Sequence, residues 1–145
     1  MKEIGCFFEF EELKGKEYYA NLLDFNIGRN CLRYIIRKRK ISEIYLPVYL
    51  CDVIYKVCKE ENLKINFYNI DSDFLPILSK KIINSNKFIY LVNYFGFLSN
   101  GKIKKYFGNR ENVILDNTHA FFQKPIKGMD VIYNCRKYFG VPDGA

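Results

Sequence analysis

The sequence has no Cys-x-x-Cys pair, although its 145 residues include five cysteines. No spacing typical of a zinc site is therefore present. The odd number of cysteines also argues against a disulfide framework. We expect no structural metal, and free thiols in a reducing cytosol. The cysteines are Cys6, Cys31, Cys51, Cys58 and Cys135.

A long apolar run is also missing. The longest, residues 88–98, is interrupted by Asn93 and is too short to span a bilayer. Near the N-terminus, Glu9, Glu11 and Glu12 form an acidic cluster, whereas a secretion signal begins with basic residues. We therefore expect a soluble, cytoplasmic protein without a membrane partner.

Tryptophan is absent, but tyrosine and phenylalanine raise the aromatic content to 17%, and apolar residues make up 49% of the chain. With 27% charged residues, this composition is typical of a globular protein and excludes a disordered one. A chain of this length can bury one hydrophobic core, so we predict a single domain over residues 1–145.

Basic residues outnumber acidic ones by 23 to 16, which gives a net charge of +7. This charge allows a nucleic-acid-binding module, with the basic residues between positions 33 and 40 as its surface. The same residues also fit a solvated helix face. Because no nucleic-acid motif is present and the aromatic residues lie in strand-like runs, we expect no nucleic-acid partner.

Short runs rich in β-branched and aromatic residues alternate with segments of helical spacing. This alternation predicts an α/β fold with a mostly parallel sheet, right-handed crossovers and flanking helices. The predicted strands are residues 43–47, 64–68, 88–92, 113–115 and 131–133, and the predicted helices begin near Cys31, at Asp52 and at Gly101.

In such sheets, ligands bind beyond the carboxyl ends of the strands. This rule selects the four segments that directly follow a predicted strand. They also contain the unusual residues of the chain. The segments are residues 47–51, 93–96, 116–119 and 134–140.

Asp116 ends a buried strand, where a carboxylate needs a cationic or N–H partner to stay charged. It is either a turn or helix-capping aspartate or an acid that pairs with a protonated ligand nitrogen. His119, the only histidine, follows three residues later in the same loop. A lone histidine is often structural, but this position also suits a functional side chain.

Lys137 follows the last predicted strand and stands between Arg136 and two aromatic residues. We expect desolvation and like-charge repulsion to weaken its preference for the charged form, which favours a nucleophilic lysine. The alternative is a surface lysine with a packed stem.

Gly28, Arg29 and Asn30 precede the helix that begins near Cys31. The amide groups of such a helix terminus suit a phosphate. Asn30 equally fits the role of a plain N-cap.

Together these features resemble fold-type-I pyridoxal-phosphate enzymes, and most closely a divergent branch of the DegT/DnrJ/StrS-type sugar aminotransferases. The resemblance extends from about residue 27 to residue 145. Its most specific part is residues 133–144, with the pattern Arg-Lys-aromatic-aromatic-Gly-Val-Pro-Asp-Gly, followed by residues 114–119.

The resemblance implies that Lys137 forms the internal aldimine with pyridoxal phosphate and that Asp116 pairs with the pyridinium nitrogen. His119 would lie near the ring and its phenolic oxygen. Tyr49 is the favoured residue for stacking on the ring. If the loop of residues 47–51 is aligned differently with the family, Cys51 takes that place.

The phosphate would lie at Gly28, Arg29 and Asn30. Here the family usually has Ser-Gly-Thr, and Arg29 would replace the missing hydroxyl groups by charge. Asn134 stands where the family commonly has a serine before the lysine. The loop of residues 93–96 would line the same pocket.

Family members are more than twice as long, so the resemblance implies only the N-terminal part of the large domain. An antiparallel strand that follows the lysine loop would lie inside the family's sheet, and its absence would leave a gap or force a rearrangement. The resemblance also implies a homodimer or larger assembly, a small-molecule amino donor and a keto acceptor such as a keto-sugar. The alternative is a truncated, non-catalytic remnant that keeps the fold.

Overall fold

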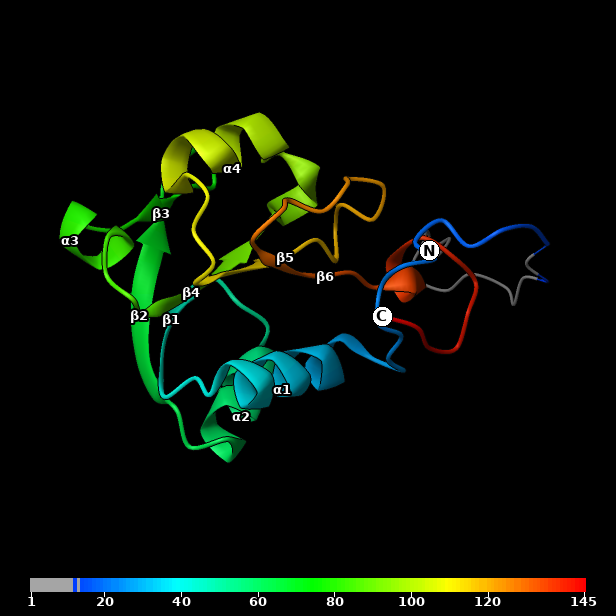
Figure 1. The fold of residues 1–145 in the computed structure, drawn as a ribbon, viewed down its shortest axis with the longest axis horizontal. Helices are drawn as coiled ribbons and strands as arrows, with labels where there is room; N and C mark the ends of the chain where they lie inside the picture. Colours follow the sequence, from blue (N-terminus) through cyan, green and yellow to red (C-terminus); the bar gives the residue numbers. More distant parts are fainter. Residues whose placement is uncertain (1–11, 13) are drawn as a thin grey trace, which may run out of the picture.

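The computed structural model describes residue 12 and residues 14–145. Cys6 and the acidic residues Glu9 and Glu11 lie outside the described residues. A six-stranded sheet in the order β3-β2-β1-β4-β5-β6 forms the centre of the fold (Figure 1). All neighbouring strands run parallel except β3, which is antiparallel to β2. The strands are β1 (Glu43–Pro47), β2 (Lys64–Ile70), β3 (Pro76–Ile77), β4 (Phe88–Val92), β5 (Val113–Asp116) and β6 (Asp130–Ile132).

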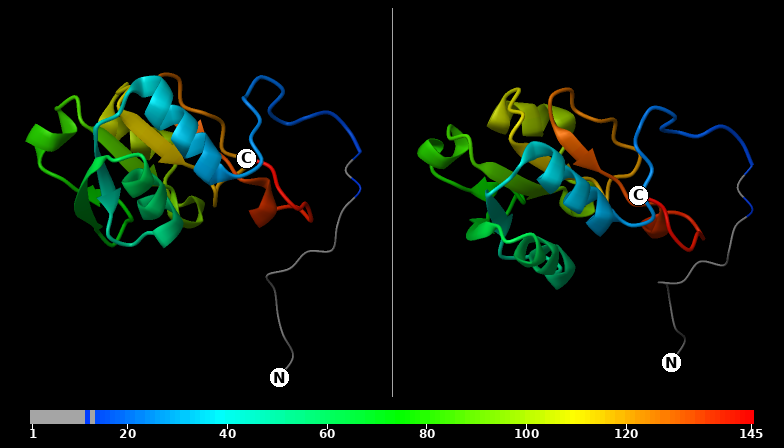
Figure 2. Two further views of the ribbon diagram at one scale, coloured as in Figure 1. Left: turned by 90° about the horizontal axis from the view of Figure 1, so that it is seen from below. Right: turned by 60° about the horizontal axis from the view of Figure 1, so that its bottom comes forward.

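Helices cover both faces of the sheet (Figures 1 and 2). The helices α1 (Gly28–Arg39) and α2 (Asp52–Glu60) lie on one face, and α4 (Asn100–Phe107) lies on the other. A short helix, α3 (Lys80–Ile83), and two 3₁₀ turns, η1 (Tyr94–Gly96) and η2 (Cys135–Lys137), complete the elements. None of the helices in the described part of the chain has the length and apolar character needed to cross a membrane.

The core has two halves, one on each side of the sheet. Along β4, Tyr90 and Val92 pack toward α1 and α2, whereas Ile89 and Leu91 pack toward α4. Burial on both faces explains why β4 is a continuous apolar run, as is usual for a parallel strand between two helix layers.

The predicted strands and main helices are found, with small shifts at their ends. For example, β6 begins one residue earlier than expected, so that Tyr133 lies just beyond it. The sequence patterns missed β3 and α3. The basic residues of α1 are partly neutralised on the helix face: Arg37 pairs with Glu61 and Arg39 pairs with Asp130.

The gap expected inside the sheet does not occur among the described residues, because β1 to β6 are contiguous. β6 is instead an edge strand. Beside it, Ala145 exchanges two backbone hydrogen bonds of 2.8 Å with Phe25, and the amide of Cys135 donates to the carbonyl of Gly144 at 3.0 Å. These bonds place the last two residues between the 3₁₀ turn η2 and residues 25–26.

Candidate functional site

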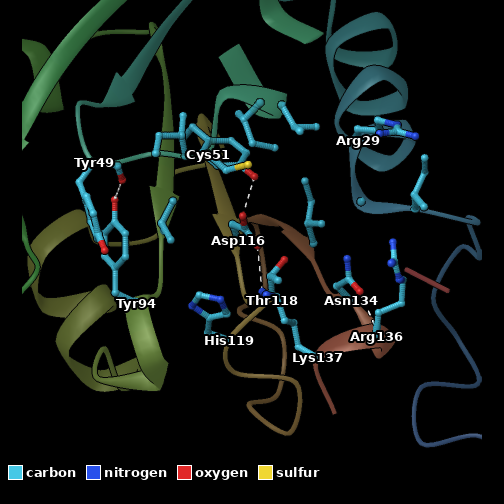
Figure 3. Close-up of a pocket in the computed structure, with 18 of the residues that line it drawn as sticks. Arg29, Tyr49, Cys51, Tyr94, Asp116, Thr118, His119, Asn134, Arg136 and Lys137 are labelled. Carbon is cyan, nitrogen blue, oxygen red and sulfur yellow. Dashed lines mark hydrogen bonds between the residues drawn. The ribbon is translucent and has the colours of Figure 1, made fainter. Parts of the chain in front are cut away.

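A cavity of about 670 Å³ opens at the carboxyl ends of β1, β4, β5 and β6 (Figure 3). Of the eight site residues predicted from the sequence, all except Asn30 line it. Cys51, the alternative stacking residue, also lines it. The fold therefore gathers side chains from five segments that are far apart in the sequence, as the strand-end rule predicts. The predicted residues that line the cavity are Gly28, Arg29, Tyr49, Asp116, His119, Asn134 and Lys137.

Asp116 lies at the floor of this cavity and is 9% exposed. The Tyr90 hydroxyl donates to Asp116 Oδ2 at 2.7 Å, and the Thr118 amide donates to Asp116 Oδ1 at 2.9 Å. Burial, and after it the charge of Asp116, raises the pKa of Tyr90 well above its ordinary value, so this phenol remains a donor. A carboxylate has about four acceptor sites, so Asp116 can accept a further N–H from the cavity.

The Asp116 loop is fixed from below by a buried cluster of amide side chains. Asn93, which is fully buried, donates from Nδ2 to Asn117 Oδ1 at 3.1 Å and to Gln123 Oε1 at 3.2 Å. Its Oδ1 accepts the Leu98 amide at 2.9 Å. The loops that follow β4 and β5 are thereby joined into one rigid unit.

His119 belongs to the same loop, and its ring stacks on Phe95 with the centroids 5.6 Å apart and an interplanar angle of 18°. Its Nδ1 atom is buried and has no hydrogen-bond partner among the described residues. A buried nitrogen of this kind is an available donor or acceptor for a ligand in the cavity.

Lys137 ends η2, directly after β6, and its side chain lines the cavity (Figure 3). The expected desolvation of this lysine is wrong, because Lys137 is exposed. The neighbouring rings of Tyr138 and Phe139 pack against Phe121 and Phe122 rather than around the ammonium group.

The first turn of α1 supplies the other side of the cavity. A Cβ at Gly28 would lie 3.6 Å from Ile132 Cγ2 and 3.8 Å from Asn134 Nδ2, so helix and strand approach closely here. The N-cap of α1 is Ile27, which makes no side-chain cap bond. The amides of Gly28 and Arg29, as the first two of the helix, therefore have no intrahelical acceptor.

Asn30 lies outside the cavity, and the alternative reading of Asn30 as the N-cap is wrong. It is the third residue of α1, and its amide donates to the Ile27 carbonyl at 3.0 Å. Its side chain donates to Asn26 Oδ1 at 2.7 Å and accepts from Arg33 at 3.1 Å. Asn134 Oδ1 accepts the Arg136 amide at 3.0 Å and so caps η2.

Tyr49 lines the cavity opposite α1, and its ring stacks on Tyr94 with the centroids 5.5 Å apart. The Tyr94 hydroxyl donates to the Tyr49 carbonyl. Cys51 is the exposed N-cap residue of α2. Both candidates for the stacking residue therefore remain at the cavity wall.

Two cavity residues with polar side chains, Tyr90 and Arg136, were not predicted from the sequence as contributors to the site. Arg136 adjoins Lys137 in the sequence. Two adjacent cations after a predicted strand were a signal that Arg136 also contributes to the site. Tyr90 has no such signal, because in the sequence it looks like one more apolar residue of a buried strand.

Comparison with known proteins gives a fold but no family. No family model matches the chain, and no curated protein matches it. Several solved structures share its fold, including the following two. A candidate aminotransferase from Burkholderia pseudomallei has a TM-score of 0.58 at 12% identity and covers 79% of this chain. An L-threonine-O-3-phosphate decarboxylase from Porphyromonas gingivalis has a TM-score of 0.60 at 18% identity and covers 83%.

The chain shares part of its fold with these two proteins. This confirms the predicted fold class, an α/β fold with a mostly parallel sheet and flanking helices. The chain spans 39% and 41% of the two neighbours' lengths. At these identities the likeness extends to the fold alone.

Proposed function

We propose that this chain forms the cofactor-binding part of a pyridoxal-phosphate enzyme of the aminotransferase type, related to the DegT/DnrJ/StrS group. The observation that carries the proposal is the shared cavity of Asp116 and Lys137. A buried carboxylate with acceptor capacity faces the same space as a primary amine, and cations gather beside the amine.

The cavity residues fit this cofactor in three respects. Arg29, Arg136 and the uncapped first turn of α1 provide charge and N–H donors for a phosphate. Asp116 provides an acceptor for a protonated ring nitrogen. The unpartnered His119 Nδ1 provides a polar contact for a ring substituent.

When bound, pyridoxal phosphate supplies an aldehyde and an electron-withdrawing ring. Lys137 would hold the group at its aldehyde carbon through Nζ, and the same amine would take up or release a proton. Asp116 would accept the N–H of the ring nitrogen. Tyr49 would lie against one face of the ring.

In its complete form, the enzyme would transfer an amino group from a small amino donor to a keto acceptor such as a keto-sugar. We also propose that two or more copies assemble, as the resemblance to the DegT/DnrJ/StrS group implies. A sedimentation experiment that finds only a monomer would overturn the assembly.

The experiment that tests the function is borohydride reduction of the protein with pyridoxal phosphate, followed by peptide mapping by mass spectrometry. We expect a phosphopyridoxyl group on Lys137 and none after Lys137→Arg, which keeps the charge. Lys124→Arg, at another exposed lysine, should leave the label in place. Labels scattered over many lysines would overturn the proposal.

A second candidate is a folded, non-catalytic remnant. The exposure of Lys137 favours it, because an exposed amine lacks the desolvation that activates a nucleophile. A cooperatively folded protein that takes up no cofactor would support this candidate.

A further inference from the structure

The cavity has two chemically different sides. Figure 3 shows Tyr49 and Tyr94 on the side opposite Arg29 and Arg136, with Asp116 between them. Rings continue from the first side to the outer surface. We call this surface the aromatic wall, and it consists of Tyr49, Phe74, Tyr94, Phe95 and Phe97.

The rings of the aromatic wall form one connected array. Tyr49 stacks on Tyr94, and Phe74 stacks on Phe97 with the centroids 5.5 Å apart and an interplanar angle of 8°. Phe74 also contacts Tyr94 and Phe95. Through Phe95 the array reaches the His119 ring inside the cavity.

Three of these rings face solvent over most of their area. Tyr49 is 63% exposed, Phe95 is 61% exposed and Phe97 is 62% exposed. Single exposed apolar residues are common, but adjacent large rings beside a cavity mark a binding surface.

The backbone holds two of the rings in an unfavourable conformation. Phe95 has a φ of +53° and Phe74 has a φ of +61°, both in the left-handed region. Such a φ is unfavourable for a residue with a Cβ. Backbone strain of this kind clusters at functional sites, and at Phe95 it accompanies an exposed ring.

The charged residues of the cavity do not belong to the aromatic wall. They are Arg29, Asp116, Arg136 and Lys137. The hydroxyl of Tyr94 is already engaged by the Tyr49 carbonyl. The wall therefore offers ring faces and few polar groups, which suits an uncharged planar ring.

We propose that the aromatic wall binds an uncharged arene ring carried by the substrate, so that the substrate class is an aryl-bearing amine or ketone. The ring would stack on one of Phe95 and Phe97, whose planes are 77° apart, and meet the other at its edge. The reactive carbon would lie toward Lys137. The assignment as substrate rests on the proposed function, which gives Lys137 its role. Binding of the ring itself does not depend on the cofactor.

The absence of tryptophan permits a direct test. The fluorescence anisotropy of tryptophol, a neutral indole without an amine, is measured against protein without added cofactor. We expect saturable binding, weakened about 3- to 10-fold by Phe95→Ala and similarly by Phe97→Ala, because a stacked aromatic pair contributes about 0.5–1.5 kcal/mol. Phe122→Ala is the matched control, because this ring is 55% exposed but lies outside the wall.

Equal affinity in wild type and in both wall variants would overturn the proposal. So would a change in sedimenting mass on Phe95→Ala without tryptophol binding, because the wall would then be a contact between copies. A borohydride label on Lys137 without tryptophol binding overturns this inference alone. Tryptophol binding without the label supports the ring site and overturns the proposed function.

Discussion

The two loops that carry the central groups of the site are held in different ways. The Asp116 loop is buried, and hydrogen bonds from Tyr90, Thr118 and the Asn93 cluster fix it. The Lys137 loop is exposed, and the backbone bonds at Cys135 and the packing of neighbouring rings hold it. The acceptor side of the cavity is therefore preorganised, whereas Lys137 lies on a segment that can open locally.

The largest expected effect comes from breaking the amide cluster. Asn93→Ala leaves the Leu98 amide and the Asn117 and Gln123 oxygens without a buried partner. We expect the free energy of unfolding, measured with urea, to fall by about 3 kcal/mol. Asn86→Ala, at an exposed asparagine, is the control and should change it little. Equal losses in both variants would show that the cluster is not the support of the loop.

A smaller effect is expected when one donor to Asp116 is removed. Tyr90→Phe keeps the packing but deletes the hydroxyl that donates to the buried carboxylate. Hydrogen bonds to charged groups contribute about 1.5–3 kcal/mol, so the free energy of unfolding should fall by about 2 kcal/mol. Tyr55→Phe, on a partly exposed ring of α2, is the matched control. An unchanged urea midpoint for Tyr90→Phe would contradict the preorganised acceptor.

The position of both loops could be predicted from the sequence, because strand ends of a parallel sheet meet at one edge. The contact between Tyr90 and Asp116 could not. It depends on the register of β4 against β5, in which Val92 lies opposite Asp116 and Tyr90 therefore points to the same face. A register between strands is set by packing across the whole sheet and leaves no local signal.

The elements that were missed are those that tertiary contacts stabilise. β3 has two residues and no apolar periodicity, and it is held by pairing with β2 and by the Tyr106 hydroxyl on the Pro76 carbonyl. The exposure of Lys137 was missed for a similar reason. Flanking aromatic residues suggest burial, but their rings turn to partners from a distant segment.

Gly144→Ala tests how the Lys137 loop is held, because Gly144 bonds to Cys135 in that loop. Gly144 has a φ of +117°, and a Cβ there would lie 3.2 Å from Cys135 Sγ. We expect a loss of about 1.5 kcal/mol, seen as faster hydrogen exchange of the Cys135 amide. Gly108→Ala, also at positive φ but in open space, separates backbone strain from the contact when the free energy of unfolding of both variants is measured with urea. Equal effects in the two variants would assign the whole loss to strain.

The smallest expected effect is a pH dependence of the free energy of unfolding. It compares the burial of a thiol near Asp116 with that of a thiol in the Lys137 loop. Burial is the main cause that raises the pKa of Cys31, beneath Asp116, to about 11, and it also raises the pKa of Cys135 in the Lys137 loop. A raised thiol pKa means that the folded state retains a proton that the unfolded state loses, so stability falls as the pH rises through the unfolded pKa near 9. Between pH 7 and pH 9, Cys31 should contribute a loss of about 0.4 kcal/mol. The loss of stability between pH 7 and pH 9 is measured by urea unfolding in the wild type and in both variants. It should be smaller than in the wild type in both, and the reduction should be larger in Cys31→Ala than in Cys135→Ala. The opposite order would mean that the thiol of the Lys137 loop is the better buried one, and the contrast between the two loops would then be wrong.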